Sequence, residues 1–457
     1  MKKAIILFFL LAFCVAAQEV REDTSVVKIE QKSLFLTVVS WPLVHIVQPT
    51  IEFLMYPLLP PLIYISRENL IEKGQNLITY GENKQIMFYP IINAKPGNGS
   101  NIGFAYWHSE LFLQDDNLFL SPHLYINADW DATLRYVKKN ICNSSFYWGL
   151  SASYNADGDN GFRDLKGVKY SFADSSIFFN QSVGFGLYGD WGLEFGLGLS
   201  LYRFDFPSIN DVIVEGDNVS NRGFYQHFNG YPLSVSLSYN SLDEPYAATK
   251  GSKFSLGYSY TPISRYNGST DHNYYVVESR LVRYFLLGNK SYAMTVAESN
   301  ANLEKLKNLS FSEAIEMLNP INIKEEDILD RRILVTQIKA RYLIEENEGK
   351  APFTAMGRHG GNFPLRAYSD GYIAAPLVAG VSAEYRWPID RFADALIFNE
   401  YGIFGTDFSR LTSDNLRNSY GFGFRIRTPR FFITRFTIAF HGLQGITLIF
   451  TTRPEYN

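Results

Sequence analysis

The chain has 457 residues, of which 19% are charged and 16% aromatic, and it contains 34 glycines. An ordinary soluble domain carries about 25% charged residues, so this balance disfavours a disordered chain or a helical repeat and favours a sheet protein with two apolar environments. The formal net charge of -4, without a basic block, excludes an electrostatic surface for nucleic acid.

Residues 1–17 have the pattern of a secretory signal peptide. Two lysines precede an apolar run over residues 4–15, and Ala17 ends a pair of small residues suited to cleavage. A lipoprotein signal through Cys14 is the alternative, disfavoured because a bulky residue precedes the cysteine where a small one is wanted. Removal of the signal would leave Cys142 as the only cysteine, which excludes an internal disulfide or a cysteine-based metal cluster.

Residues 18–100 are predicted to form an N-terminal periplasmic or interfacial segment. Beyond the signal, no stretch offers about 20 uninterrupted apolar residues, which excludes an inner-membrane helical bundle. The most apolar part, residues 33–65, is divided by five prolines into pieces too short to span as a helix. Two alternatives stay open for it: packing at a barrel mouth, or lying on the membrane surface.

Residues 101–457 follow a period of two, with apolar side chains on one face and small or polar side chains on the other. The sharpest case is the stretch 191–201, where Trp, Leu and Phe alternate with Gly, Glu and Ser. Closing such a sheet satisfies every backbone group inside lipid, so the pattern predicts an all-β protein, an integral outer-membrane antiparallel β-barrel of about 16 strands. The strands are expected near 101–113, 118–128, 131–139, 145–154, 170–180, 182–189, 191–204, 231–240, 252–260, 273–286, 333–345, 378–388, 394–404, 419–428, 432–441 and 445–453.

Residues 297–332 break the alternation. Charged residues there lie among leucines and isoleucines at helical spacing, which predicts a helical insertion. By strand parity this insertion lies on the periplasmic side with the N-terminus. It is either a solvated insert or a docking site for a periplasmic partner.

Five short motifs lie in order between Tyr239 and the C-terminus, and together they resemble the BamA/TamA (bacterial surface antigen) family of outer-membrane barrels. They are Asp243, Pro245 and Thr249-Lys250-Gly251; Ala351-Pro352-Phe353 with Gly360-Gly361 and Leu365-Arg366-Ala367-Tyr368; Glu384-Tyr385-Arg386-Trp387-Pro388-Ile389; Asn399-Glu400-Tyr401-Gly402; and the run Tyr420 to Pro429.

The resemblance implies that residues 351–377 form an outside loop that folds back into the barrel lumen. The residues of this lumen latch are Gly360, Gly361, Leu365, Arg366 and Tyr368. Arg366 would meet acidic side chains of the inner wall, since a guanidinium offers several donors in fixed geometry. The expected latch partners are Glu400, Glu384, Gly402, Gly421, Gly423 and Arg425, with Gly421 and Gly423 leaving room for the loop.

Three departures from the family are visible. Ala367 stands where the family has glycine, and Glu400 stands where it has aspartate, so the acid reaches further. Residues 18–100 leave room for at most one periplasmic POTRA domain. Their apolar run is broken by prolines and does not suit the βααββ fold of such a domain, so we expect none. The alternatives for Arg366 itself are an ordinary loop arginine and a structural salt bridge without a gating role.

The function implied is outer-membrane protein assembly, insertion or translocation, in the outer membrane of a Gram-negative-type bacterium. The alternative is a passive channel or structural barrel that has lost the assembly role. Expected partners are outer-membrane lipid, unfolded outer-membrane protein clients or a periplasmic partner. We expect no enzyme, metal site or cofactor, because the seven histidines lack metal-ligand spacing and the chain has no nucleophile elbow or phosphate loop.

Overall fold

The computed structural model describes the chain in pieces, and the predicted signal peptide at 1–17 lies outside them, as does the insertion at 297–332 apart from Arg332. The described residues are 49–50, 73–74, 77–81, 85–94, 100–125, 129–163, 169–187, 189–205, 227–243, 248–265, 272–287, 332–346, 351–361, 364–369, 371–389, 393–427, 432–442 and 445–452.

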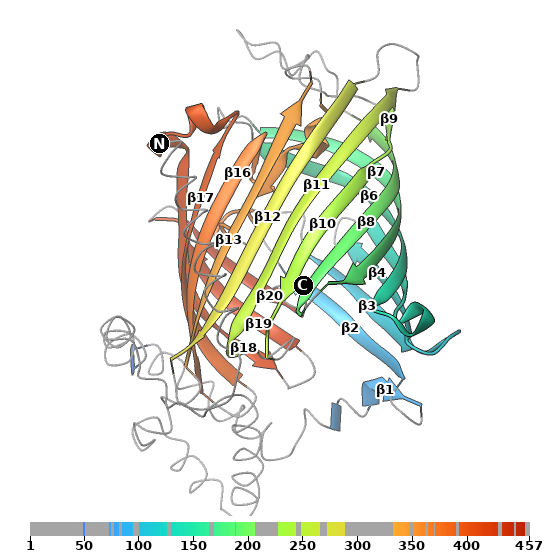
Figure 1. Ribbon diagram of the computed structural model, residues 1–457. Helices are drawn as coiled ribbons and strands as arrows, with labels where there is room; N and C mark the ends of the chain where they lie inside the picture. The colour runs from blue at the N-terminus through green and yellow to red at the C-terminus, as the bar shows by residue number, and fades with distance from the viewer. Residues whose placement is uncertain are drawn as a thin grey trace, which may run out of the picture.

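One sheet contains all the strands, and it closes on itself as an antiparallel barrel (Figure 1). The strands are β1 (Thr79–Tyr80), β2 (Ile86–Ala94), β3 (Asn101–Ser109), β4 (Asp116–Tyr125), β5 (Trp130–Lys138), β6 (Phe146–Arg163), β7 (Lys169–Gly186), β8 (Trp191–Asp205), β9 (His227–Gly230), β10 (Leu233–Asn240), β11 (Gly251–Arg265), β12 (His272–Leu286), β13 (Ile333–Glu345), β14 (Gly357–His359), β15 (Ile373–Ala375), β16 (Leu377–Pro388), β17 (Ala393–Gly405), β18 (Leu416–Arg427), β19 (Phe432–Phe440) and β20 (Ile446–Thr451). Short 3₁₀ turns are η4 (Ile141–Asn143), η7 (Phe353–Ala355), η8 (Phe408–Arg410) and η9 (Ser413–Asn415).

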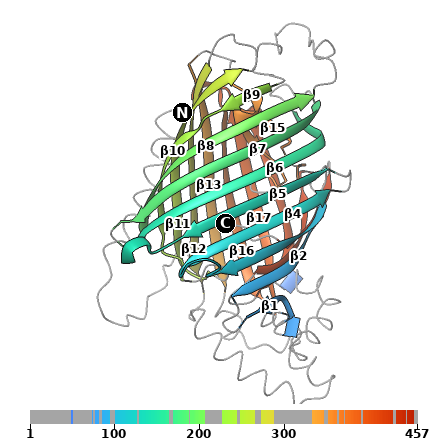
Figure 2. The same ribbon diagram turned by 90° about the vertical axis from the view of Figure 1, so that its right-hand side faces the viewer.

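The barrel wall has 16 strands, as predicted. β9 and β10 both pair with β8 and β11, so they form one strand of the wall, interrupted at Tyr231-Pro232. The 16 strands of the wall do not include the short strands β1, β14 and β15. Figure 2 shows the strong tilt of β4 to β8 that barrel closure requires.

Two errors in the predicted strand list cancel in this count. The stretches 170–180 and 182–189 were separated at a polar run, but they form the single long strand β7. The first wall strand is β2, which pairs with β3 along its length and with β20 at its end. The predicted barrel start at residue 101 is therefore wrong, because Pro90 made the 86–94 region resemble the proline-broken segment before it.

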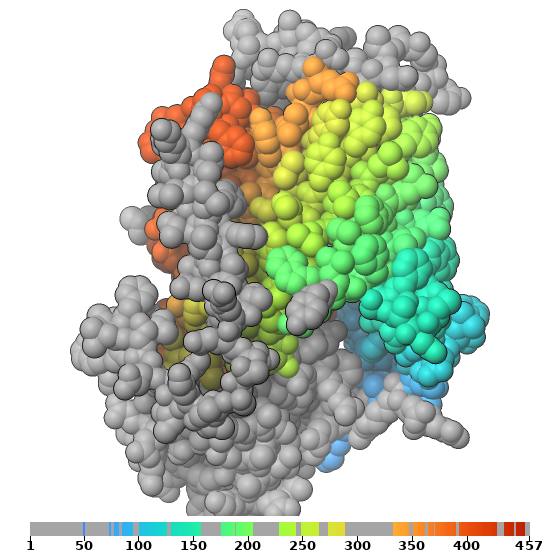
Figure 3. All heavy atoms as spheres, viewed as in Figure 1, coloured from blue at the N-terminus to red at the C-terminus, as the bar shows by residue number. Residues whose placement is uncertain are grey.

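The two faces of the wall differ in chemistry. Large apolar side chains point outward and stay exposed, for example Ile102 at 59%, Leu197 at 57% and Leu448 at 58%. Figure 3 shows the side chains of β8 to β12 packed side by side on the outer face of the wall. Among the described residues, no helix is long and apolar enough to cross a membrane.

The seam between β2 and β20 is the weakest junction in the described wall. It has two paired positions, Asn93 with Thr451 and Ala94 with Phe450, whereas β2 and β3 share eight. Thr451 Oγ1 also donates to Asn93 Oδ1 over 2.7 Å. The β2–β20 junction therefore has the shortest ladder in the described wall.

Pro90 lies on the edge of β2 that faces the seam. The backbone N–H of Ile92 donates to Thr452 Oγ1 over 3.2 Å, which shows that the polar groups of Ile92 point toward the seam. Because strand backbones repeat every two residues, the polar groups of Pro90 point the same way. Proline has no N–H, and within sheets it is confined to such edges and to bulges.

Candidate lumen latch

The loop between β13 and β16 folds into the lumen and packs against the inner wall. It contains the η7 turn and the short hairpin of β14 and β15. Leu365, Ile373 and Ala375 form a buried cluster with Val378 of β16 and Phe404 of β17. The fold-back expected for residues 351–377 is therefore present in the described part of this loop.

The backbone of the latch turns sharply before Arg366. Gly360 and Gly361 have φ angles of +117° and +73°, and Leu365 has φ +74°. Positive φ is easy for glycine and costly for leucine, so Leu365 stores local strain. Ala367, which replaces the family glycine, is not among the positive-φ residues. An alanine therefore fits at this position without backbone strain.

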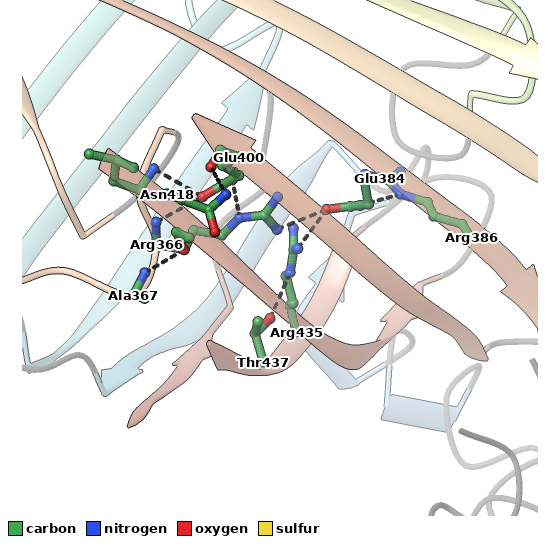
Figure 4. Close-up of polar contacts among 10 residues, drawn as sticks. Arg366, Ala367, Glu384, Arg386, Glu400, Asn418, Arg435 and Thr437 are labelled. Atoms are coloured by element: carbon green, nitrogen blue, oxygen red, sulfur yellow. Dashed lines mark hydrogen bonds and ion pairs between the residues drawn. The ribbon is translucent and has the colours of Figure 1, made fainter. Parts of the chain in front are cut away.

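Arg366 lies between two buried carboxylates (Figure 4). Its Nε is 2.5 Å from Glu400 Oε1 and its Nη1 is 2.8 Å from Glu384 Oε2. The backbone N–H groups of Leu365 and Arg366 both donate to Glu400 Oε2 over 2.9 Å. Both glutamates are 0% exposed, so one carboxylate holds the strained backbone and the guanidinium together.

Glu384 joins the latch to a wider ion network. Its Oε1 accepts from Arg386 Nε over 2.6 Å, and its Oε2 accepts from Arg435 Nη2 over 2.8 Å. The Arg366 guanidinium also lies 3.8 Å from the ring centre of Phe398. Buried charges must be paired to be tolerated, and here several cations share two acids across β16, β17 and β19.

The tip of the latch also bonds the last strand. The N–H of Ala367 donates to Ser419 Oγ of β18 over 3.0 Å. The carbonyl oxygen of Ala367 accepts from Thr447 Oγ1 of β20 over 2.7 Å. The docked loop therefore contacts the strand that borders the seam.

Glycines make room for the loop, but only some of those expected. A Cβ at Gly402 would lie 2.8 Å from Leu365 Cδ1, and one at Gly380 would lie 2.4 Å from Pro364 Cγ. A Cβ at Gly421 or Gly423 would instead lie 2.1 Å from a backbone oxygen of β19. These two glycines allow close approach of β18 to β19, and Gly421 also leaves room for Phe398, since a Cβ there would lie 2.9 Å from its Cζ.

The other expected residues are placed as follows. Tyr368 stacks on Tyr372 and on His441, with ring centres 5.0 and 4.8 Å apart. Arg425 Nε bonds Asp394 Oδ2 over 3.0 Å, which makes it part of a buried ion pair between β17 and β18. This ion pair places Arg425 on the inner wall.

Sequence reasoning missed Arg435, Ser419 and Thr447 as latch contacts. The alternation along β19 places Arg435 on the inward face, opposite Phe436, so its orientation was readable. Nothing in the sequence says which side chains of other strands lie at the same height, because this depends on the register. Among the described residues, no group of three or more His, Cys, Asp or Glu side chains could hold a metal ion.

No protein-family model and no curated protein matches the sequence. Among solved structures, the chain is similar to BamA from Haemophilus ducreyi lacking POTRA domains 1–3, with 16% identity over 80% of this chain and 69% of that chain, and a TM-score of 0.55. The chain has the fold of the BamA barrel. CdiB from Acinetobacter baumannii and CdiB from Escherichia coli match at 10% and 11% identity, with TM-scores of 0.48 and 0.47, over 80% of this chain. The match covers 59% and 61% of those two CdiB chains.

Proposed function

We propose that this BamA-type barrel lies in the outer membrane of a Gram-negative-type bacterium and assists the assembly, insertion or translocation of protein clients. The apolar outer face suits a lipid environment and the polar lumen does not, which supports the membrane placement.

The observation that carries the proposal is the link between latch and seam. Arg366 is held by Glu384 and Glu400, and the next residue accepts a hydrogen bond from Thr447 of β20. Release of the guanidinium would remove one support of the strand that forms half of the seam. A barrel whose wall opens there exposes strand edges on which a client strand can form hydrogen bonds.

A passive channel is the second candidate, and the lining of β8, β10 and β11 favours it. Their inward side chains include Gly196, Ser234, Ser236, Gly257 and Ser259, which are small and uncharged. Small side chains of this kind would suit the passage of solutes along these strands.

The test uses the full chain in liposomes and follows the folding rate of an unfolded small outer-membrane barrel, compared with empty liposomes. We expect acceleration by the wild type and its loss in Arg366→Ala. Arg410→Ala is the matched control, because Arg410 is an exposed loop arginine, 76% exposed, at 4.0 Å from Asp407.

The outcomes separate the two candidates. No acceleration by the wild type overturns autonomous assembly activity. If the same liposomes then admit small solutes, the passive channel is supported. Acceleration that survives Arg366→Ala would retain an assembly role but remove the latch from it.

A further inference from the structure

A second buried polar constellation lies on the inner wall, on β4 and β5, away from the latch. Ser121 Oγ is 3.0 Å from His123 Nε2, and His123 Nδ1 is 2.6 Å from Asp131 Oδ1. Ser121 is 3% exposed and His123 6%. A hydroxyl, an imidazole and a carboxylate joined in this order have the connectivity of a serine nucleophile, its base and the group that orients the base.

The strand geometry brings these three side chains together. Ser121 and His123 are two residues apart on β4, so both point into the lumen, and the register places His123 directly opposite Asp131 of β5. The imidazole has room only because the residue opposite it on β3 is a glycine: a Cβ at Gly103 would lie 2.7 Å from His123 Cδ2. Tyr125 donates a hydrogen bond to the other oxygen of Asp131, which fixes the carboxylate.

The two ring nitrogens of His123 face different partners. Nδ1 lies against the Asp131 carboxylate, which accepts hydrogen bonds, and Nε2 lies against the Ser121 hydroxyl, which can donate to it when the ring proton is on Nδ1. We propose that Ser121 is an acylating nucleophile, with His123 as its general base and Asp131 as the positioning residue. The site would hydrolyse small acyl esters that enter the lumen.

The reaction needs only an ester and water. Ser121 Oγ bonds to the ester carbonyl carbon while its proton passes to His123 Nε2. The carbon–oxygen bond to the leaving alcohol breaks, and the same proton goes to that alcohol. Water then attacks the acyl-serine through the same base, releasing the carboxylic acid and restoring the serine hydroxyl.

The ladder beside these residues is interrupted. β3 and β4 pair at Gly103 with His123 and again at Tyr106 with Leu120, and the ladder skips Phe104 and Ala105 between them. Pro122 lies in the opposite gap and has no N–H to donate to the ladder.

The small exposed fraction of Ser121 limits the ligand. A bulky chain would have to displace neighbouring side chains, whereas a short acyl group on a flat leaving group needs little room. The appropriate probes are therefore 4-nitrophenyl acetate as substrate and a short alkyl fluorophosphonate as a covalent label.

The experiment incubates the purified, folded barrel in detergent with each probe. We expect one equivalent of label on Ser121 and ester hydrolysis above the rate of the empty micelle, with both lost in Ser121→Ala. His123→Ala should remove labelling. Asp131→Asn should lower kcat by about 10³–10⁴-fold with little change in KM, since the analogous change in a serine triad leaves geometry intact but disturbs the base.

Ser153→Ala is the matched control, because Ser153 of β6 lies in the same inward row, opposite Thr133, which is itself opposite Ser121. This variant should label like the wild type. Heat-dependent gel mobility shows whether each variant folds. A folded wild type that labels no more than Ser121→Ala, or equal labelling of both serine variants, overturns the proposal and leaves a polar network that only fastens β4 to β5.

Discussion

The two sides of the barrel wall use their inward faces in opposite ways. On β8, β10 and β11 the inward side chains are mostly glycine and serine, and Glu194 is bonded to Tyr147 over 2.6 Å. On β16 to β19 the inward face carries buried ions that receive the latch. Small inward residues offer a loop no charged partner, whereas the fixed charges on β16 and β17 specify where the loop docks.

The largest expected effect separates two glutamates of the wall. Glu400→Ala removes the carboxylate that holds Arg366 and two backbone N–H groups, which leaves a buried cation without this partner. We expect a loss of about 3–5 kcal/mol of unfolding free energy. Glu194→Ala, on the small-residue side, should cost much less. Urea unfolding in liposomes measures both, and equal losses would contradict the division of the wall.

A pair of glycines sharpens the same division. Gly402→Ala places a methyl group 2.8 Å from Leu365, which should displace the loop at a cost of about 1–3 kcal/mol. Gly257→Ala meets only a backbone oxygen at 3.9 Å and should be silent. The rate of limited proteolysis within residues 351–377 reports loop docking. Equal proteolysis rates in the two variants would show that the docked loop accommodates a methyl group at position 402.

A pH effect is expected for the latch loop but not for the opposite wall. Burial lowers the pKa of His359, which lies in the folded-in loop, to about 4. The unfolded group titrates near 6.5, so the folded loop favours the neutral ring and its contribution is complete above that pH. It falls as pH drops from about 6.5 toward 4, by about 2 kcal/mol at pH 5.

Loop proteolysis between pH 7.5 and 5 measures this loss. His359→Gln keeps a side-chain donor for the carbonyl of Ala379 and removes the titration, so its pH series should be flatter than that of the wild type. A variant that loses protection with the same pH profile would assign the effect to other groups.

The last prediction concerns the orientation of the barrel in the membrane and involves no change in stability. Cys142 is exposed in the turn between β5 and β6, at the same end of the barrel as the start of β2. If that end is periplasmic, a membrane-impermeant maleimide should not label it in intact cells and should label it after lysis. Labelling in intact cells would reverse the orientation and put the latch loop on the periplasmic side.

Much of the wall was readable from alternation, because lipid and lumen impose opposite chemistry on neighbouring residues. The exceptions are physical. β2 contains Pro90, and β7 contains the polar run around Gln181, so one strand was overlooked and another was divided. The pairing of Arg366 with Glu384 and Glu400 followed from motif order and face, whereas Thr447 depends on register, which local sequence does not encode.

The expectation that the chain is not an enzyme rested on the lack of metal-ligand spacing, of a nucleophile elbow and of a phosphate loop. The proposed site lies outside those patterns, because Ser121 and His123 are two residues apart on one strand and Asp131 lies opposite His123 only through the β4–β5 register. A search for same-face pairs along every strand would have found the first two residues but not the carboxylate.

Pro90 has a consequence for the number of hydrogen bonds that can ever close the circle. Whatever chain lies opposite that part of β2, it meets a position with an acceptor and no donor. The hydrogen-bond ladder at the seam therefore lacks one backbone donor, because the sequence places a proline there. Neither a change of temperature or lipid nor a longer partner strand can supply that donor. The β2 edge of the seam therefore always forms one backbone hydrogen bond fewer than a strand edge without proline.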